Sequence, residues 1–309
     1  MSCAVRVSAY AKINLSLGVL GVRPDGYHEV RTIFQSIALH DTLIVRARRG
    51  PFALQCDDPD CPTGGANLVR QAAERVWAAS GRRGIVRDVE IQLTKRIPLQ
   101  AGLGGGSSDA AAALRLFGSL WRVKEPSLRE IAAALGADVP YFLEGGTALG
   151  LDRGDVLYPL VDQPAAWVTL VVPEFGVITA EAYRWWDQAG GPDQVRPTPD
   201  PQNDLQGPVA THHPEIVQIV SALRKAGASH AAMSGSGSAV FGLFRRHQAA
   251  ERAARALSKR PRAMFGPEGS GPRSILVTRT INHAACQRLA GITAHRINLP
   301  FAPRSLGHS

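Results

Sequence analysis

The alternation of apolar and polar positions predicts that the chain opens with β-strands. Residues 5–20 alternate over most of their length, which is typical of a half-buried strand. The turn-forming sequence Pro24-Asp25-Gly26 follows, and two further extended segments, 29–39 and 41–47, come after it. We therefore expect the beginning of the chain to be rich in β-structure.

Helical spacing of apolar residues comes next along the chain. It predicts a helix over residues 67–79, and a strand pattern over 89–93 leads into a glycine-rich segment. The alanine-rich run after the glycines predicts a second helix over 108–121. Ser107 or Ser108 is placed to cap that helix at its N-terminus, because serine side chains accept hydrogen bonds from first-turn N–H groups.

A third helix is predicted shortly afterwards. Ser127 is expected to be its N-cap, with Glu130 completing a capping box, and the helix should end at Gly136. Asp138 then lies in a loop that leaves the helix. Pro140 is expected to disfavour the resumption of regular structure there, because proline restricts both itself and the residue before it.

The pattern begins a new cycle of strands and helices near residue 162, where we place a domain boundary. Strands are predicted at 167–172 and 274–279, and helices at 216–226 and 249–257. The expected division is an N-terminal domain, a C-terminal domain and a basic C-terminal extension, at residues 1–162, 163–282 and 283–309.

The composition is that of a globular protein with a substantial core, since 45% of the 309 residues are hydrophobic. No apolar run approaches the roughly 18 residues that a membrane helix needs, and the N-terminal segment lacks the features of a signal peptide. The four cysteines include no C-x-x-C pair, which indicates free thiols in a reducing compartment. We therefore expect a cytoplasmic protein without membrane contact.

The net charge of +9 raises the question of a nucleic-acid partner. The basic residues are mostly scattered arginines, and no dense basic run is interleaved with aromatic residues. A positive surface also suits a small polyanionic substrate. We expect no nucleic-acid partner, and a basic nucleic-acid-binding protein is the alternative from a different functional class.

The glycine-rich segment predicts a phosphate-binding loop. Gly104, Gly105 and Gly106 allow the backbone to approach a ligand closely, and the helix that follows presents unpaired N–H groups at its positive end. The alternative is a plain glycine-rich link between a strand and a helix. No lysine follows the last glycine as the Walker pattern requires, and Ser107 excludes the dinucleotide pattern G-x-G-x-x-G.

Two further residues complete a set of groups for phosphoryl transfer. Lys12 is one of only five lysines and lies in the middle of an apolar strand. Alone, such a lysine could simply extend along apolar surface to solvent. Phosphoryl transfer to a hydroxyl needs a phosphate cradle, a cation on the transferred charge and a carboxylate near the nucleophile, which the loop, Lys12 and Asp138 supply.

The loop resembles the phosphate loop of the GHMP kinases, the superfamily of galactokinase, homoserine kinase and mevalonate kinase. Pro98, Gly102, Leu103, Ser107 and Ser108 match its pattern Pro-x-x-x-Gly-Leu-(Gly)-Ser-Ser. The resemblance implies an α+β chain with the two-domain GHMP kinase fold. Its N-terminal domain would be ribosomal-protein-S5-domain-2-like and its C-terminal domain ferredoxin-like, with the active site in the cleft between them.

Two motifs narrow the resemblance within the superfamily. Residues 10–15, Tyr-Ala-Lys-Ile-Asn-Leu, and 23–28, Arg-Pro-Asp-Gly-Tyr-His, resemble the family that phosphorylates 4-diphosphocytidyl-2-C-methyl-D-erythritol in the non-mevalonate isoprenoid pathway. The resemblance implies transfer of the γ-phosphate of ATP to the 2-hydroxyl of the methylerythritol, with Mg²⁺ on the nucleotide. A homoserine or mevalonate kinase specificity is the alternative, which Tyr27 and His28 disfavour.

The resemblance also implies roles for individual residues. Lys12 and Asp138 would be catalytic, with the carboxylate acting either as a base or as a group that orients the hydroxyl. The residues expected to bind ATP are Asn67, Lys95, Pro98, Gly102, Leu103, Gly104, Gly105, Gly106, Ser107 and Ser108, the last with its hydroxyl near Mg²⁺. Those expected to bind the substrate are Asn14, Tyr27, His28, Phe175 and Thr179, and a glycine turn near the phosphates comprises Gly235, Ser236 and Gly237.

Some points stay open at the level of the sequence. Asn67 could serve simply as the N-cap of the helix that follows it. Asp109 places a negative charge directly after the loop, where it could either reach Mg²⁺ or turn away from the phosphates. We expect the protein to act as a monomer or a weak homodimer.

Overall fold

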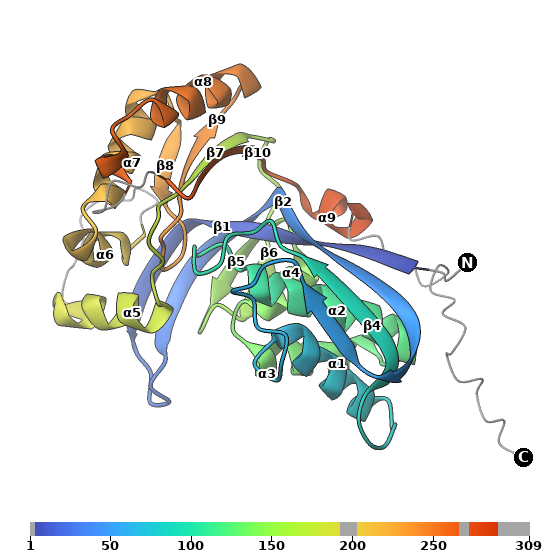
Figure 1. Ribbon diagram of the computed structural model, residues 1–309. Coiled ribbons are helices and arrows are strands. Elements are labelled where there is room, and N and C mark those ends of the chain that lie inside the picture. Colours follow the sequence, from blue (N-terminus) through green and yellow to red (C-terminus); the bar gives the residue numbers. More distant parts are fainter. Residues whose placement is uncertain (1–3, 192–202, 266–271, 290–309) are drawn as a thin grey trace, which may run out of the picture.

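The computed structural model describes residues 4–191, 203–265 and 272–289. Two β-sheets form its framework, and helices cover the outer face of each sheet (Figure 1). The first sheet consists of β1 (Ala4–Val22), β2 (His28–Pro51), β3 (Ala53–Cys56), β4 (Arg87–Thr94), β5 (Thr147–Leu151) and β6 (Val156–Pro159).

The long antiparallel hairpin of β1 and β2 spans the whole first sheet and continues beyond it to α5 (Thr179–Gln188) (Figure 1). The strand order is β3-β4-β2-β5-β6, and β1 also pairs with β2. The prediction of two separate strands at 29–39 and 41–47 was wrong, because His40 between them still pairs with Tyr10 of β1. The strand therefore continues through a shift in register between Tyr10 and Lys12, and both segments belong to β2.

Four helices cover one face of the first sheet. Their apolar faces and the sheet enclose the first core, in which Phe117 and Trp121 stack with ring centres 4.5 Å apart. The helices are α1 (Leu68–Ala79), α2 (Gly105–Trp121), α3 (Glu125–Leu135) and α4 (Val139–Glu144).

The structure differs from the sequence prediction at the starts of α2, α3 and α4, and each difference has a local cause. The helix α2 begins at Gly105, so its N-cap is Gly104 with φ 71° rather than Ser107 or Ser108. A left-handed turn at glycine reverses the chain without the steric penalty that a side chain would add. The helix therefore starts inside the glycine run, and the serines lie in its first turn.

Prolines explain the starts of α3 and α4. The helix α3 starts at Glu125 rather than after Ser127, with Pro126 in its first turn. The helix α4 starts directly after Asp138 with Pro140 in its first turn, although Pro140 was expected to disfavour regular structure there. Proline is tolerated in the first turn because the N–H group that it lacks would have no partner within the helix.

The second sheet and its helices follow the predicted ferredoxin-like order, with a strand, a helical segment of three helices, two strands, a helix and a strand. Its strands are all antiparallel in the order β10-β7-β9-β8. They are β7 (Trp167–Val172), β8 (His230–Met233), β9 (Val240–Phe244) and β10 (Ser274–Arg279). The helices of this part are α5, α6 (Gln206–His212), α7 (Glu215–Lys225) and α8 (His247–Ser258), with a short 3-10 turn at Arg262–Met264.

A separate apolar cluster joins the two sheets. Ala11 and Ile13 of β1 pack there with Leu170 of β7 and Phe241 of β9, and all four are fully buried. Leu103 from the glycine-rich segment belongs to the same cluster. Burial of the loop's own side chain between the sheets therefore fixes the glycine-rich segment at their junction.

The chain leaves the first sheet at Pro159 and enters the second at Trp167. The predicted division at residue 162 stays a prediction. The first residues of the expected extension form α9 (His283–Leu289), which packs back on the first half, where Gln287 Nε2 donates to Glu144 O at 2.9 Å. Residues 290–309 of that extension lie outside the described residues.

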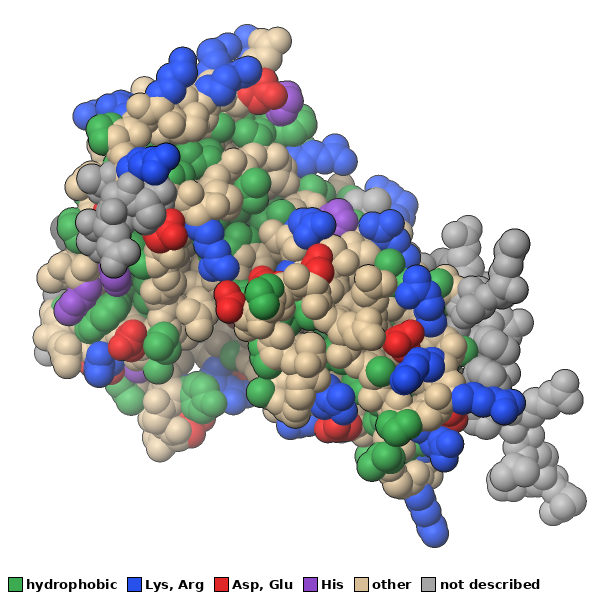
Figure 2. Space-filling view, viewed as in Figure 1, with side chains coloured by type: hydrophobic (Ala, Val, Ile, Leu, Met, Phe, Trp, Pro, Cys, Tyr) green, Lys and Arg blue, Asp and Glu red, His purple; other side chains and the backbone are tan. Residues whose placement is uncertain are grey.

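Exposed basic side chains gather over α8 and its flanks, at the top of the molecule in Figure 2. They are Arg245, Arg246, Arg252, Arg255, Lys259, Arg260 and Arg262. No helix in the described part of the chain is long and apolar enough to cross a membrane.

Candidate active site

A pocket of about 530 Å³ lies where the two sheets meet. Its walls come from β1, β2, the glycine-rich loop, the residue before α4, the turn between β5 and β6, and the start of α5. The predicted site residues that line it are Lys12, Asn14, Pro98, Gly102, Leu103, Gly104, Gly105, Gly106, Ser107, Asp138, Thr179, Gly235 and Ser236.

The loop is held against the turn before β9. At Gly102, with φ 72°, an added Cβ would lie 2.1 Å from Ser234 O. Ser234 Oγ donates to Gly102 O at 3.0 Å, and Ala239 N donates to Ala101 O at 3.1 Å. Glycine is required at this position because both the backbone conformation and the contact exclude a side chain.

The start of α2 offers an anion site to the pocket. The first bond within the helix is donated by Ser108 N to Gly104 O at 2.9 Å. The N–H groups of Gly105, Gly106 and Ser107 come before it and therefore have no acceptor within the helix. These three residues line the pocket, so amide dipoles and the positive helix end are available to a phosphate.

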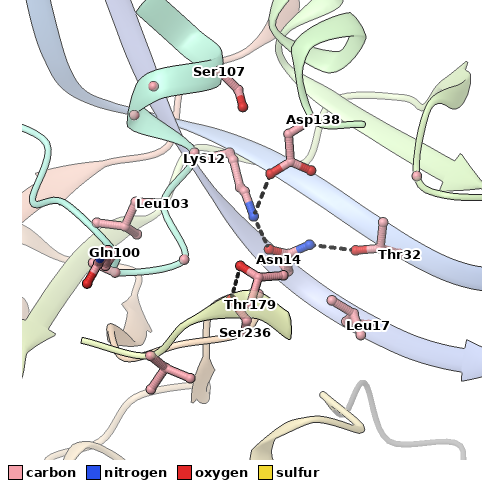
Figure 3. A pocket seen from close by; sticks show the side chains of 18 of the residues that line it. Lys12, Asn14, Leu17, Thr32, Gln100, Leu103, Ser107, Asp138, Thr179 and Ser236 are labelled. Carbon is pink, nitrogen blue, oxygen red and sulfur yellow. Dashed lines mark hydrogen bonds and ion pairs between the residues drawn. The ribbon is translucent and has the colours of Figure 1, made fainter. Parts of the chain in front are cut away.

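The Lys12 ammonium lies between two side chains at the centre of the pocket (Figure 3). Its Nζ donates to Asn14 Oδ1 at 2.6 Å and lies 3.5 Å from Asp138 Oδ2. The lysine side chain is 4% exposed and the Asp138 side chain 34% exposed. The cation is thus fixed by the protein, while the carboxylate is open to a ligand.

Asp138 occupies the N-cap position of α4, yet its side chain makes no capping hydrogen bond to the described residues of that helix. A carboxylate in this position usually satisfies first-turn N–H groups. Here it points toward Lys12 instead (Figure 3). The start of α4 therefore positions the carboxylate without consuming its hydrogen-bonding capacity.

A chain of hydrogen bonds fixes the orientation of the Asn14 amide. Its Nδ2 donates to Thr32 Oγ1 at 2.7 Å, and Thr32 Oγ1 donates to Ser16 O at 2.7 Å. The hydroxyl of Thr32 donates its single proton to a carbonyl, so toward Asn14 it can only accept. The amide nitrogen of Asn14 therefore faces Thr32, and Asn14 Oδ1 faces Lys12. The network thus holds the ammonium in one place.

Among the lining residues that the sequence reasoning missed, four have polar side chains. Thr32 belongs to the network above, Gln100 lies in the loop, and Arg153 and Tyr183 line the far end of the pocket. Thr179, which was predicted, lines the pocket with its Oγ1 3.1 Å from Ser236 Oγ. Alternation along β2 could have suggested Thr32, but no sequence signal indicates that Arg153 reaches the same cavity.

Lys95, predicted to bind ATP, does not line the pocket. Its ammonium is buried between the carboxylates of Asp41 and Asp109, with Nζ 2.7 Å from Asp109 Oδ2. Although burial lowers it, the two carboxylates raise the pKa of Lys95 above its ordinary value. The question about Asp109 is answered by this contact, because its carboxyl turns away from the loop toward Lys95.

Three other residues predicted on the ATP side also lie outside the pocket lining. Asn67 caps α1, since its Oδ1 accepts from Val69 N at 2.8 Å. Ser108 is buried, and its Oγ donates to Tyr10 O at 2.7 Å. Gly237 follows Ser236 in the turn before β9, and its N donates to Ser234 O at 2.9 Å.

The three aromatic residues predicted to bind the substrate base lie beside the pocket rather than in its lining. His28 Nε2 lies 2.8 Å from Asp187 Oδ1, and its ring stacks on Tyr183 at 4.5 Å. Tyr27 is 55% exposed on the hairpin turn. Phe175 stacks on His213 with ring centres 4.1 Å apart. Tyr183 is the residue that connects this aromatic group to the pocket.

Comparison with known proteins identifies the family. Residues 67–146 match the N terminal domain of the GHMP kinases and residues 199–263 match the GHMP kinases C terminal domain. A 4-diphosphocytidyl-2-C-methyl-D-erythritol kinase from Pelotomaculum thermopropionicum is 42% identical over 296 residues, which cover 89% of this chain and 97% of that protein. One from Solibacter usitatus is 44% identical, covering 79% of this chain and 83% of that protein.

The chain belongs to the 4-diphosphocytidyl-2-C-methyl-D-erythritol kinase family. A crystal structure of 4-(cytidine 5'-diphospho)-2C-methyl-D-erythritol kinase superposes with TM-score 0.72 and 34% identity, covering 89% of this chain and 99% of that one. A homoserine kinase from Cytophaga hutchinsonii shares the fold at 20% identity, with TM-score 0.63, covering 91% of this chain and 96% of that one. The predicted GHMP kinase fold is confirmed, and the chain is a small-molecule kinase.

Substitution of Asp109 should change how stability depends on pH. Burial raises the pKa of this carboxyl to about 8, against the opposing effect of Lys95. Between the unfolded value of roughly 3.9 and the folded one, the folded state holds a proton that the unfolded state releases. Its stabilising contribution is therefore complete at low pH and is lost as the pH rises toward 8.

We expect the free energy of unfolding of the wild type to fall more steeply between pH 5 and 8 than that of Asp109→Asn. Urea unfolding at a series of pH values measures both profiles. Asp60→Asn, at an exposed position, is the matched control and should follow the wild type. Parallel profiles for the wild type and Asp109→Asn would show that Asp109 is already ionised when folded.

Gly102→Ala should disrupt the junction between the loop and the second sheet. The new Cβ meets a backbone oxygen and the backbone stays in the left-handed region, so we expect a loss of at least about 2 kcal/mol. Gly207→Ala is the control, because nothing lies within 4 Å of its Cβ position in α6. Equal stability of the two variants in urea unfolding would contradict the tight contact.

Proposed function

We propose that the protein transfers the γ-phosphate of ATP to the 2-hydroxyl of 4-diphosphocytidyl-2-C-methyl-D-erythritol. The observation that carries the proposal is the Lys12–Asp138 pair beside the N-terminus of α2 in one pocket. Membership in a family with that name supports the choice of acceptor. The enzyme would act in the non-mevalonate pathway, which synthesises isoprenoid precursors.

The proposed ATP side is the glycine loop with the first turn of α2. The N–H groups of residues 105–107 and the helix dipole would hold the phosphates, as they do for anions at other helix starts. The backbone can approach them closely because Gly104 and Gly105 carry no side chain. Leu68, Pro98 and Leu99 line the same end of the pocket and offer apolar contact to the nucleoside.

The transfer step follows from the positions of Lys12 and Asp138. The acceptor oxygen forms a bond to the γ-phosphorus while the bond from that phosphorus to the bridging oxygen of ADP breaks. The hydroxyl proton passes to Asp138, and Lys12 offsets the negative charge on the transferred phosphoryl group. A loose transition state removes that proton late, so orientation of the hydroxyl by Asp138 is as important as its basicity.

Mg²⁺ is proposed to enter with the nucleotide. Ser107, whose hydroxyl points into the pocket in Figure 3, and Asp138 are lining oxygen donors of the kind that Mg²⁺ accepts. Ser108 is not assigned this role, because its hydroxyl is bonded to Tyr10 O. The ion would neutralise charge on the ATP phosphates during transfer.

The acceptor's cytosine is proposed to lie at the aromatic group beside the far end of the pocket. Tyr27 is exposed and can stack on a base, and Phe175 can supply an opposite wall. His28 is 12% exposed and held by Asp187, so a ring edge is presented in a fixed orientation. Asn14 and Thr179 would contact the part of the acceptor nearest to the reacting hydroxyl.

Localisation, oligomeric state, partners and domain division belong to the same proposal. We propose a cytoplasmic enzyme that acts as a monomer or weak homodimer, without a nucleic-acid or membrane partner. The domain division at 1–162, 163–282 and 283–309 belongs to the proposal, with α9 at the start of the last segment.

A panel of acceptors tests the function. Purified protein with Mg²⁺ should consume ATP with 4-diphosphocytidyl-2-C-methyl-D-erythritol and not with homoserine or mevalonate. A coupled assay for ADP measures the rates, and mass spectrometry locates the added phosphate. Turnover of homoserine or mevalonate instead would overturn the proposed acceptor. Tight, salt-sensitive RNA binding without turnover would overturn the kinase itself.

Asp138→Asn tests the role of the carboxylate. We expect kcat to fall by about 10²- to 10⁴-fold, because the amide cannot accept the hydroxyl proton, while ATP binding is retained. Asp60→Asn is the control at an exposed site and should keep the wild-type rate. A wild-type kcat for Asp138→Asn with the correct product would remove Asp138 from the transfer step.

A further inference from the structure

Two basic side chains line the pocket within the described residues, and the mechanism uses one of them. These are Lys12 and Arg153. Lys12 is committed to the reacting centre by its contacts with Asn14 and Asp138. The proposed acceptor carries a diphosphate of its own, which needs a second positive group at some distance from the transferred phosphoryl group.

Arg153 lies at the far end of the pocket, in the turn between β5 and β6. That turn is tied to β2 by a bond from Val30 N to Asp152 O at 2.7 Å. Val30 and Gly154 line the pocket together with Arg153. The turn that carries Arg153 is therefore supported by β2, on the side of the pocket proposed for the acceptor, and not by the glycine loop.

The guanidinium is oriented but not fully used. Its Nη2 donates to Asp155, and its central carbon lies 5.3 Å from the centre of the Tyr27 ring. The side chain of Arg153 is 29% exposed. A guanidinium has five N–H donors in a planar fork, so donors remain for a ligand after the bond to Asp155. The position next to Tyr27 places them beside the proposed cytosine site.

We propose that Arg153 binds the diphosphate that links the cytidine of the acceptor to its methylerythritol. The inference rests on the proposed function, since it takes the acceptor from there. A base stacked on Tyr27 brings its own phosphates close to the neighbouring guanidinium, and arginine recognises phosphate through paired hydrogen bonds. Arg153 is thus a specificity-determining residue for a nucleotide-linked acceptor.

Inhibition by fragments of the acceptor tests the inference. CDP and cytidine are used as competitive inhibitors of the wild type, Arg153→Gln and Arg153→Lys. We expect Arg153→Gln to raise the KM for the acceptor and the Ki of CDP by about 10- to 100-fold, through the loss of charge-assisted bonds. The Ki of cytidine, the KM for ATP and kcat should stay within about twofold, and Arg153→Lys should recover part of the loss.

Arg23→Gln is the matched control. Arg23 lies on the neighbouring hairpin turn and pairs with Asp25 and Asp152, but it is not among the described residues that line the pocket. Its substitution should leave the Ki of CDP unchanged. Thermal unfolding of each variant shows whether the turn between β5 and β6 still folds.

The outcomes separate the two proposals. Equal losses of CDP and cytidine affinity in Arg153→Gln, or no loss of CDP affinity, would overturn the role of Arg153. A wild-type protein that does not phosphorylate the cytidylated acceptor would overturn the proposed function instead. In that case calorimetric titration of CDP into the wild type and Arg153→Gln still decides whether Arg153 binds a nucleotide diphosphate.

Discussion

The Lys95 ammonium, buried between the carboxylates of Asp41 and Asp109, is the interaction on which the phosphate loop depends. It joins β2, the end of β4 and the first turns of α2, so both ends of the loop are tied to one point. Asp41 also accepts from the backbone N–H of Ile97 at 2.8 Å, where the loop begins. Loss of Lys95 would leave the buried Asp41 carboxylate without its cation, at a cost of roughly 3–5 kcal/mol.

The other side of the loop is held by the second sheet. Ser234 and Ala239 bond to its backbone, and Leu103 is buried in the cluster between the sheets. The reacting pair comes from the first sheet and its helices, with Lys12 on β1 and Asp138 before α4, while the start of α5 and the turn before β9 supply the facing wall of the pocket. The site thus exists because the two sheets pack together, and neither sheet contains all of it.

Much of the candidate site could be predicted because a glycine run, a lysine within an apolar strand and a carboxylate just after a predicted helix are local signals. The roles of Lys95 and Ser108 could not, since both look like phosphate ligands in sequence. In the fold each finds a partner far along the chain, Asp41 for Lys95 and Tyr10 O for Ser108. A polar side chain is available to a ligand only if it is not already hydrogen-bonded or ion-paired to a buried group of the protein.

The sequence by itself determined the strand and helix pattern, the glycine loop and the family motifs around Lys12, because these depend on neighbours within a few residues. Tertiary structure alone decided the start of α2 at Gly105, the burial of Asp109 and the arrival of Arg153 in the pocket. The helix start depends on a left-handed glycine packed against other elements. The two charged residues depend on which strands pair, and long-range pairing leaves no local periodicity to detect.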